Sequence, residues 1–252
     1  MKQEAASLLL AVQFLTRIPI PSKGLYSPER MAASVRYYSV VGLLVGCVSA
    51  AVFALSLTVF PQVIAILLAI AAGLLLTGGF HEDGLADTFD GIGGGLDRDR
   101  ALEIMRDSRL GTYGTLALTI VLLTKTASLA LLPIGFVAAA LVTAHGLSRL
   151  SSVLVIATST YVRAEGTGKP VAERVSAVSL ATIMITGIAI VAAWCWVLPP
   201  MALACAVLGL AVGHGLMRLL FEPKLGGYTG DTLGAVQQVS ELGFYLGLLA
   251  WL

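Results

Sequence analysis

The sequence predicts an all-α protein, a polytopic transmembrane helical bundle of about seven spans preceded by a short interfacial helix. Of its 252 residues, 57% are hydrophobic and only 12% are charged, whereas soluble domains carry about 25% charged residues. The mean hydropathy is +0.89, and a single soluble core of this length could not bury so much apolar surface. Apolar runs of about 20 residues, the length that crosses a hydrocarbon core, also follow one another along most of the chain.

The N-terminal segment 4–17 is apolar but too short to span a bilayer, and prolines at 19 and 21 follow it. Such a segment is typical of a helix lying at the membrane interface. The predicted spans that follow it are 38–60, 62–80, 113–132, 134–158, 177–198, 200–221 and 232–252. No linker separates them, so we expect a single integral membrane domain over residues 1–252.

The breaks between the spans are of two kinds. Three are very short and contain proline, at Pro61, Pro133 and Pro199-Pro200, and proline favours a tight hairpin there because it cannot continue a helix cleanly. The others, 81–112, 159–176 and 222–231, are longer and polar. Alternating spans place the proline turns on one face and the long loops on the other.

The basic residues support this arrangement. The chain has 16 lysines and arginines and a net charge of +1, which gives no indication of a nucleic-acid partner. Those outside the spans all fall on the long-loop face, and the proline-turn face has none. Because cytoplasmic loops are enriched in Lys and Arg, we expect the long-loop face to be cytoplasmic and the bilayer to be the main partner.

One loop gathers more than half of the acidic residues. The sequence has 15 acids, and eight of them lie between positions 82 and 107: Glu82, Asp83, Asp87, Asp90, Asp97, Asp99, Glu103 and Asp107. The spacing of Asp83, Asp87 and Asp90 puts all three on one face of a helix at the end of the second span. Like charges so placed require a cation, and Mg²⁺ prefers oxygen ligands supplied by one or two carboxylates and substrate phosphates. The alternative is that the acids lie in a solvated loop and bind no metal, and this interpretation applies best to Asp97, Asp99 and Glu103.

Basic residues accompany the acids. Arg106 and Arg109 precede the third span and could clamp phosphate oxygens, while Asp107 between them could complete a metal site. A glycine-rich loop containing Tyr228 and Asp231 lies on the same face.

Several charged groups lie inside apolar spans, where each is costly unless it is paired or faces a cavity. They are Lys125, His145, Arg149, His214, Arg218 and Glu241. Arg149 and Arg218 could instead extend their side chains to the polar face, whereas Lys125 lies deeper within its apolar span.

Long motifs along the chain resemble one known family. The run from Gly79 to Gly91, GFHEDGLADTFDG, is similar to the HxDGLADxxDG signature of the cobalamin synthase (adenosylcobinamide-GDP ribazoletransferase) family. The runs RDSRLGTYG (106–114), GYTGD (227–231) and FLTRIP (14–19) resemble the same family. The likeness covers essentially the whole chain in order.

The resemblance implies an enzyme of the bacterial or archaeal cytoplasmic membrane, with its active site facing the cytoplasm. Its substrates would be a corrinoid, adenosylcobinamide-GDP, and α-ribazole or its 5′-phosphate. The ribose hydroxyl would attack the phosphate on the corrinoid side and release GMP. Mg²⁺, with Mn²⁺ as the alternative, would be required, and the number of ions and any homo-oligomer stay open.

On these grounds we assign the metal to Asp83, Asp87, Asp90 and Asp107. Arg106 and Arg109 would bind the diphosphate, and either Asp87 or Asp231 would be the general base. The expected substrate-binding residues are His81, Glu82, Arg149, Arg218 and Tyr228. His81 is also a candidate metal ligand, and Glu82 occupies a variable position of the motif.

Three other functions fit the sequence less well. A CDP-alcohol phosphotransferase also uses aspartates at a membrane boundary, but Asp87 and Thr88 stand where its pattern needs Ala and Arg. A prenyltransferase would have adjacent aspartates, which the acidic loop lacks. A transporter could use Lys125, His145 and Arg149 along a path, but it would not need so many acids in one loop.

Overall fold

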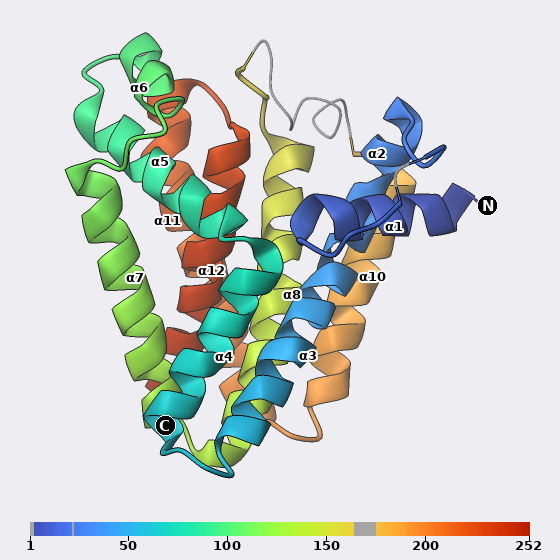
Figure 1. Cartoon of the computed structure of the whole chain (residues 1–252), viewed down its shortest axis with the longest axis vertical. Coiled ribbons are helices and arrows are strands. Elements are labelled where there is room, and N and C mark those ends of the chain that lie inside the picture. The colour runs from blue at the N-terminus through green and yellow to red at the C-terminus, as the bar shows by residue number, and fades with distance from the viewer. Residues whose placement is uncertain (1–2, 22, 164–174) are drawn as a thin grey trace.

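The structure is a bundle of long helices capped at one end by short ones (Figure 1). The computed structural model describes residues 3–21, 23–163 and 175–252. Within these ranges the regular structure is helical apart from one isolated bridge between Tyr161 and Tyr228, so the predicted all-α class is confirmed. The helices are α1 (Gln3–Leu15), α2 (Pro28–Ser34), the 3-10 helix η1 (Val35–Tyr37), α3 (Tyr38–Ser56), α4 (Gln62–Thr77), α5 (Phe80–Gly94), α6 (Arg98–Ile104), α7 (Thr112–Leu131), α8 (Ile134–Thr158), α10 (Ala177–Trp194), α11 (Pro200–Leu225) and α12 (Gly230–Trp251).

The predicted proline turns begin helices. Pro61 and Pro133 immediately precede α4 and α8, and Pro200 is the first residue of α11. Proline suits the position of Pro200 because its fixed φ matches the first turn and its missing N–H would be unpaired there anyway, and Pro61 and Pro133 are the N-cap residues of their helices. Figure 1 shows the three turns at the end of the bundle that also holds the C-terminus, opposite α5 and α6. The predicted hairpins are confirmed, whereas most of the expected break 159–176 lies outside the described residues.

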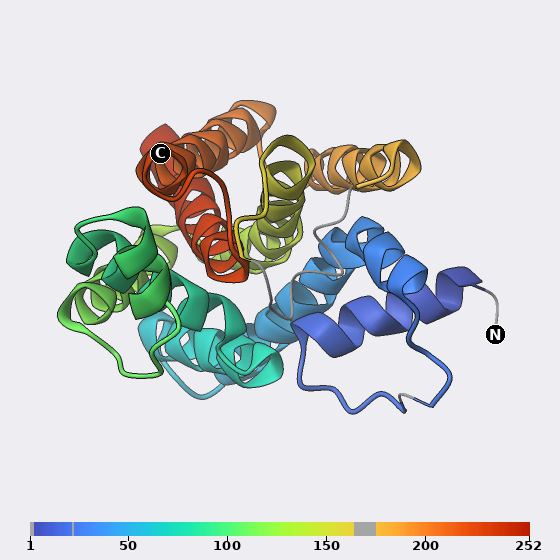
Figure 2. The same ribbon diagram turned by 90° about the horizontal axis from the view of Figure 1, so that it is seen from above.

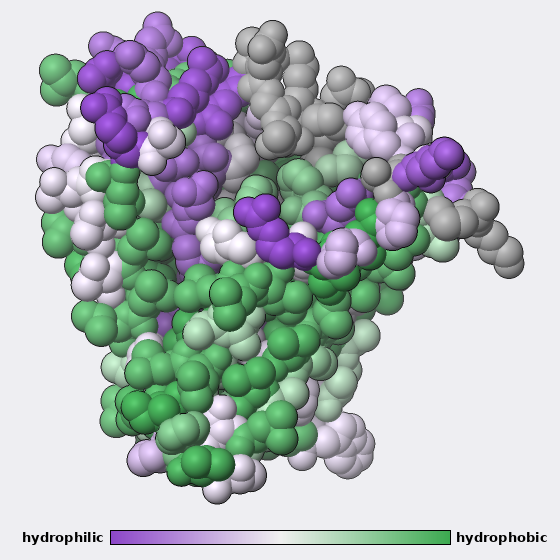
Figure 3. All heavy atoms as spheres, viewed as in Figure 1, coloured by the Kyte–Doolittle hydropathy of each residue, from purple (hydrophilic) through white to green (hydrophobic). Residues whose placement is uncertain are grey.

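The outer surface of the long helices is apolar. Leu75 on α4, Ile185 on α10 and Leu219 on α11 are 79%, 66% and 74% exposed. Hydrophobic colouring covers the sides of the bundle, and hydrophilic colouring gathers over α5 and α6 at one end (Figure 3). Because so large an apolar surface is stable only against another apolar phase, these sides face lipid.

The number of apolar spans is smaller than predicted. In the described chain, five helical segments are long and apolar enough to cross a membrane, and a sixth appears if the bent pair of α4 and α5 is one span. The seventh expected span corresponds to α12, which is 22 residues long but is not among these candidates. The reason lies in its middle, where Gln237, Gln238 and Glu241 are buried polar residues.

Two glycines bend the chain between α4 and α5. Gly78 and Gly79 have φ values of 70° and 68°, a left-handed conformation that residues with a Cβ adopt only at a cost. The axis of α5 consequently turns by 88° from that of α4. The span expected at 62–80 therefore ends at Thr77, and the acidic helix leaves the direction of the bundle.

The N-terminal helix lies against the same bend. Figure 2 shows α1 alongside α2 and next to the upper part of α3. Glu4 accepts hydrogen bonds from Arg36 Nη1 (3.0 Å) and Tyr37 Oη (2.6 Å), and the backbone N–H of Arg17 donates to Leu76 O at 2.7 Å. The short helix predicted near the N-terminus is confirmed, and its end is attached to the last turn of α4.

We predict that Gly78→Ala destabilises the protein. The new Cβ would require a left-handed alanine, at about 1–2 kcal/mol, and would also overlap the Arg17 guanidinium. Thermal unfolding in detergent should show a clear decrease in Tm. Gly135→Ala is the matched control, because a Cβ there meets nothing within 4 Å. Equal melting of both variants and the wild type would contradict the proposed role of the bend.

Candidate active site

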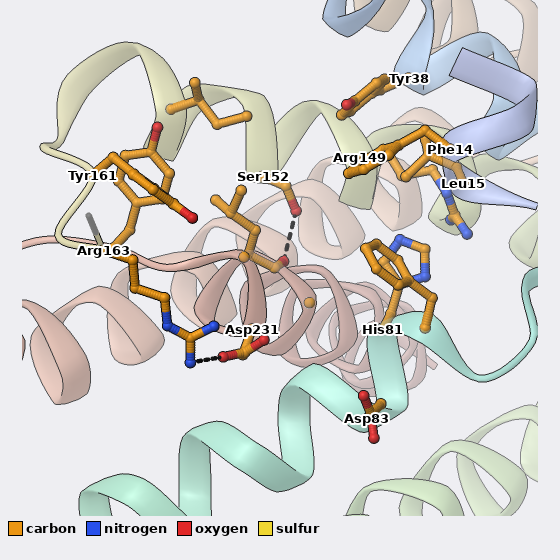
Figure 4. A pocket seen from close by; sticks show the side chains of 16 residues that line it. Phe14, Leu15, Tyr38, His81, Asp83, Arg149, Ser152, Tyr161, Arg163 and Asp231 are labelled. Carbon is orange, nitrogen blue, oxygen red and sulfur yellow. Dashed lines mark hydrogen bonds and ion pairs between the residues drawn. The ribbon is translucent and has the colours of Figure 1, made fainter. Parts of the chain in front are cut away.

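A pocket with a cavity volume of about 160 Å³, partly open to the surroundings, lies where α5 crosses the polar end of the bundle. Its walls come from α1, α3, α5, α8, the loop after α8 and the first turns of α12. Asp83, Asp231 and Arg163 are its acidic and basic residues near the loop, and Arg149 lines its inner wall. Figure 4 shows Arg163 and Asp231 on one side and Tyr38, Phe14 and Leu15 on the other.

The three aspartates of α5 have different surroundings. Asp83 lines the pocket, and Asp87 is half-buried one turn further along the helix. Burial, together with the nearby carboxylates of Asp231 and Asp83, raises the pKa of Asp87 to about 7. This concentration of negative charge is the environment in which a bound cation would be stabilised.

Asp90 is engaged by the backbone. Its carboxylate accepts hydrogen bonds from the N–H groups of Gly111 (2.7 Å) and Gly114 (2.9 Å), one on each oxygen. Asp90 therefore caps the start of α7 and fixes the loop against α5. The sequence predicts Asp90 as a metal ligand, and the structure shows its carboxylate in this capping role.

The segment before α7 is exposed. Arg109 forms an ion pair with Asp107, and its side chain is 88% exposed. Hydrogen bonds from Arg109 lower the pKa of Asp107 to about 2. Arg106 is also exposed. None of these three residues lines the pocket, so the expected convergence of Asp107, Arg106 and Arg109 on the α5 carboxylates is not seen.

Arg163 is a site residue that sequence reasoning missed. Its Nη2 lies 2.6 Å from Asp231 Oδ2 and 3.2 Å from Met105 O, and its side chain is only 13% exposed. In the sequence Arg163 is one of many basic residues on the long-loop face. Only its spatial contact with Asp231 distinguishes it, and no local pattern predicts that contact.

A short backbone pairing holds Arg163 in place. Val162 N–H donates to Tyr228 O at 3.0 Å, and Tyr228 N–H donates to Thr160 O at 2.8 Å. The rings of Tyr161 and Tyr228 meet edge to face with centroids 5.5 Å apart. This pairing brings the loop after α8 against the start of α12, and Tyr228 lines the pocket.

The other expected substrate-binding residues divide into two groups. His81 and Arg149 line the pocket. Glu82 instead accepts a hydrogen bond from Gln238 Nε2 at 2.7 Å, and Arg218 binds Glu222 (2.9 Å) and Thr158 (2.9 Å) away from the pocket. Neither Glu82 nor Arg218 lines it, but Glu82 lines a smaller cavity that His81 and Arg149 also line.

A buried charge network lies directly behind the pocket. Lys125 Nζ contacts Glu241 Oε1 (2.9 Å) and Gln238 Oε1 (2.6 Å), and Gln237 Nε2 donates to Glu241 Oε2 at 2.6 Å. The side chains of Lys125 and Glu241 are 5% and 4% exposed. The intramembrane Lys125 of the sequence is thus paired, and the network reaches Glu82 beside the pocket through Gln238.

The described residues contain no group of three or more His, Cys, Asp or Glu side chains close enough to hold a metal ion by themselves. Asp83 and Asp87 provide only oxygen donors. Mg²⁺ commonly binds one or two carboxylates and completes its shell with waters and substrate phosphates. These oxygen donors are therefore better suited to an ion that binds together with a phosphate substrate than to an ion held by protein ligands alone.

Comparisons with known proteins agree along nearly the whole chain. The family model described as cobalamin-5-phosphate synthase matches residues 7–249. Proteins named adenosylcobinamide-GDP ribazoletransferase from Shewanella amazonensis and Leptothrix cholodnii are 45% and 46% identical to this chain. Each alignment covers 98% of this chain and 96% of the relative. No solved structure matches.

We predict that Glu241→Gln strongly destabilises the protein. Removing one partner leaves the Lys125 charge buried and uncompensated, which costs about 3–5 kcal/mol. Lys125→Met combined with Glu241→Gln should recover part of this loss, as measured by unfolding in detergent. Arg100→Ala, which breaks an exposed pair with Glu103, should cost less than about 1 kcal/mol. A Glu241→Gln variant as stable as Arg100→Ala would refute this account.

Proposed function

The chain belongs to the cobalamin-5-phosphate synthase family, and we propose that it is an adenosylcobinamide-GDP ribazoletransferase. Its substrates would be adenosylcobinamide-GDP and α-ribazole or its 5′-phosphate. The observation that carries this proposal is a pocket in which Asp83, Asp231 and Arg163 come together at the polar end of the bundle. A carboxylate that accepts a proton, a guanidinium that binds phosphate and a second carboxylate for a cation are what this transfer requires.

In the reaction, the ribose hydroxyl oxygen of α-ribazole forms a bond to the phosphorus attached to the corrinoid. The bond from that phosphorus to the bridging oxygen of the diphosphate breaks, and GMP leaves with the bonding electrons. The hydroxyl proton passes to a base. The products are a phosphodiester, which is adenosylcobalamin or its 5′-phosphate, and GMP.

Asp231 is our candidate for the base. It lines the pocket, whereas Asp87 does not, and its Oδ2 is held by Arg163 at 2.6 Å. Oδ1 is left to accept the hydroxyl proton. Arg163 orients this carboxylate and adds positive charge where the diphosphate would lie, and a fixed charge in such a site stabilises developing negative charge.

Asp83 and Asp87 are the residues that would hold Mg²⁺, with Mn²⁺ as the alternative. They lie one turn apart on α5 and supply only oxygen donors, and burial together with the carboxylates of Asp231 and Asp83 raises the pKa of Asp87. When bound, the ion would neutralise charge on the diphosphate oxygens. Asp90 is left out of this set because its carboxylate caps the start of α7. Asp107 is left out because it pairs with Arg109 in the segment before α7, away from the pocket.

We also propose that the pocket faces the cytoplasm of a bacterial or archaeal cell from its inner membrane. The basic residues outside the spans favour this orientation, because positive charge is retained on the cytoplasmic side. Arg98, Arg100, Arg106 and Arg109 all lie at the end of the bundle that holds the pocket.

The transfer predicts release of GMP. Detergent-purified protein supplied with adenosylcobinamide-GDP, α-ribazole and Mg²⁺ should release GMP and form cobalamin only when both substrates are present. Asp83→Asn should lower the rate at least about a hundredfold, the scale expected when a charge that stabilises the transition state is lost. GMP and cobalamin formation are measured by chromatography.

The control for Asp83→Asn is Asp99→Asn. The Asp99 side chain is 93% exposed at the same end of the bundle, so this variant should keep full activity. A folded wild type that releases no GMP would exclude the proposed reaction. Full activity of the Asp83→Asn variant would be consistent with the proposed reaction but would show that Asp83 is not a required metal ligand.

A second prediction concerns pH and Mg²⁺. The pKa of Asp87 is raised to about 7 in the folded protein, so its contribution to stability without metal is present at low pH and is lost as the pH rises through about 7. A cation needs the deprotonated carboxylate. Mg²⁺ should therefore raise the Tm more at about pH 8 than at about pH 6.

Asp87→Asn should remove this pH-dependent effect of Mg²⁺ on the Tm. Glu103→Gln, at a carboxylate that is 68% exposed, should preserve it. An equal effect of Mg²⁺ at both pH values in the wild type would argue against Asp87 as a ligand, whatever the outcome of the GMP assay.

A further inference from the structure

The pocket has an aromatic end away from Asp231. It is formed by Phe14 of α1, Tyr38 of α3 and Phe80 of α5, all of which line the pocket. The Phe14 and Tyr38 rings are stacked with centroids 6.2 Å apart, and the Phe14 and Phe80 rings meet edge to face at 5.5 Å. Three helices distant in sequence thus contribute rings to one wall.

Three buried polar atoms at this aromatic end have no partner. Tyr38 and His81 are 4% exposed and Arg149 is 2% exposed, and none of Tyr38 Oη, His81 Nδ1 and Arg149 Nε forms a hydrogen bond in the described structure. An unpaired buried polar group costs about 1–3 kcal/mol. Because all three residues line the pocket, a ligand there would supply the missing partners.

We propose that the aromatic end, Phe14, Tyr38 and Phe80, binds the planar azole base of the acceptor substrate, α-ribazole. This inference rests on the proposed function and assigns its second substrate to a place in the pocket. The base stacks on or packs against the aromatic rings, which is favourable for a flat apolar heterocycle. Its unsubstituted ring nitrogen is an acceptor and takes a hydrogen bond from Tyr38 Oη or Arg149 Nε.

The arrangement also orients the acceptor for reaction. Figure 4 shows Tyr38, Phe14 and Arg149 on one side of the view and the Arg163–Asp231 pair on the other, with Ser152 between them. A base held at the aromatic end directs its ribose toward Asp231, the proposed proton acceptor. Positioning of this kind lowers the entropic cost of bringing hydroxyl and phosphorus together.

The guanine of the other substrate fits this end poorly. Guanine presents N–H donors that need acceptors, and the neighbouring side chains Leu15 and Phe80 are apolar. Two of the three unpartnered atoms at this end, Tyr38 Oη and Arg149 Nε, chiefly donate. A base with an acceptor nitrogen and little other polarity is the better match.

The test compares the two substrates in steady-state kinetics. Phe14→Leu should raise KM for α-ribazole at least about tenfold, because loss of base–aromatic stacking has effects on this scale. KM for adenosylcobinamide-GDP and kcat at saturation should stay within about twofold. Tyr38→Phe keeps the ring and removes the hydroxyl, so it should raise the same KM by a smaller factor.

A binding measurement and a control make the result specific. Equilibrium dialysis of α-ribazole against detergent-purified protein, without metal or the corrinoid, should show weaker binding to Phe14→Leu. Phe60→Leu removes an aromatic ring from the opposite end of the bundle, near the Pro61 turn, and should change neither KM. The Tm of each variant identifies any loss of folding.

The outcomes separate this inference from the proposed function. A wild type that makes no cobalamin refutes the function itself. Active Phe14→Leu and Tyr38→Phe variants with unchanged KM for α-ribazole would overturn the inference and leave the function intact. A rise in KM for adenosylcobinamide-GDP alone would instead assign the aromatic end to guanine, and this result would also overturn the inference.

Discussion

The bend at Gly78 and Gly79 is the constraint on which the site depends. It turns the acidic helix α5 by 88° from α4 and so removes its carboxylates from the apolar direction of the bundle. α5 then crosses α12 so closely that a Cβ at Gly84 would lie 2.7 Å from Asp231 O. This crossing brings Asp83 and Asp87 near Asp231. A straight continuation of α4 would instead extend these charges along the bundle axis, away from the first turn of α12.

The interior of the bundle supports the same crossing. Lys125 of α7 pairs with Glu241 of α12, and Gln238 connects that pair to Glu82 of α5. Buried charges of this kind contribute little net stability but impose a strong penalty on arrangements that separate them. The network therefore favours one relative placement of α5, α7 and α12. Through that placement, the polar groups inside the membrane region fix the first turn of the helix that carries Asp83.

The pocket combines segments that perform different tasks. The loop after α8 contributes Arg163, which holds Asp231, and the paired backbones around Tyr161 and Tyr228 keep that loop against α12. On the other side, α1 supplies Phe14, so the short N-terminal helix is part of the pocket wall as well as part of the polar end. The polar side suits a diphosphate and a cation, while the aromatic side suits a flat base. The two substrates of the proposed reaction differ in this same respect.

The sequence by itself determined the helical class, the proline hairpins and the acidic helix, because hydropathy, proline and helical spacing act over a few residues. It also identified the membrane-boundary cluster that contains Asp83 and Asp87, and it included Asp231, His81, Arg149 and Tyr228 among the site residues. Only the tertiary structure decided which partners these side chains have. Asp90 satisfies the amides at the start of α7, Asp107 pairs with Arg109, and Arg163, with no local signal, meets Asp231. The contacts of Asp90 and Arg163 join residues far apart in the chain, and their energy is set by burial and distance, which no spacing in the sequence encodes. Asp107 and Arg109 are close in sequence, and the fold decides that their pair lies outside the pocket.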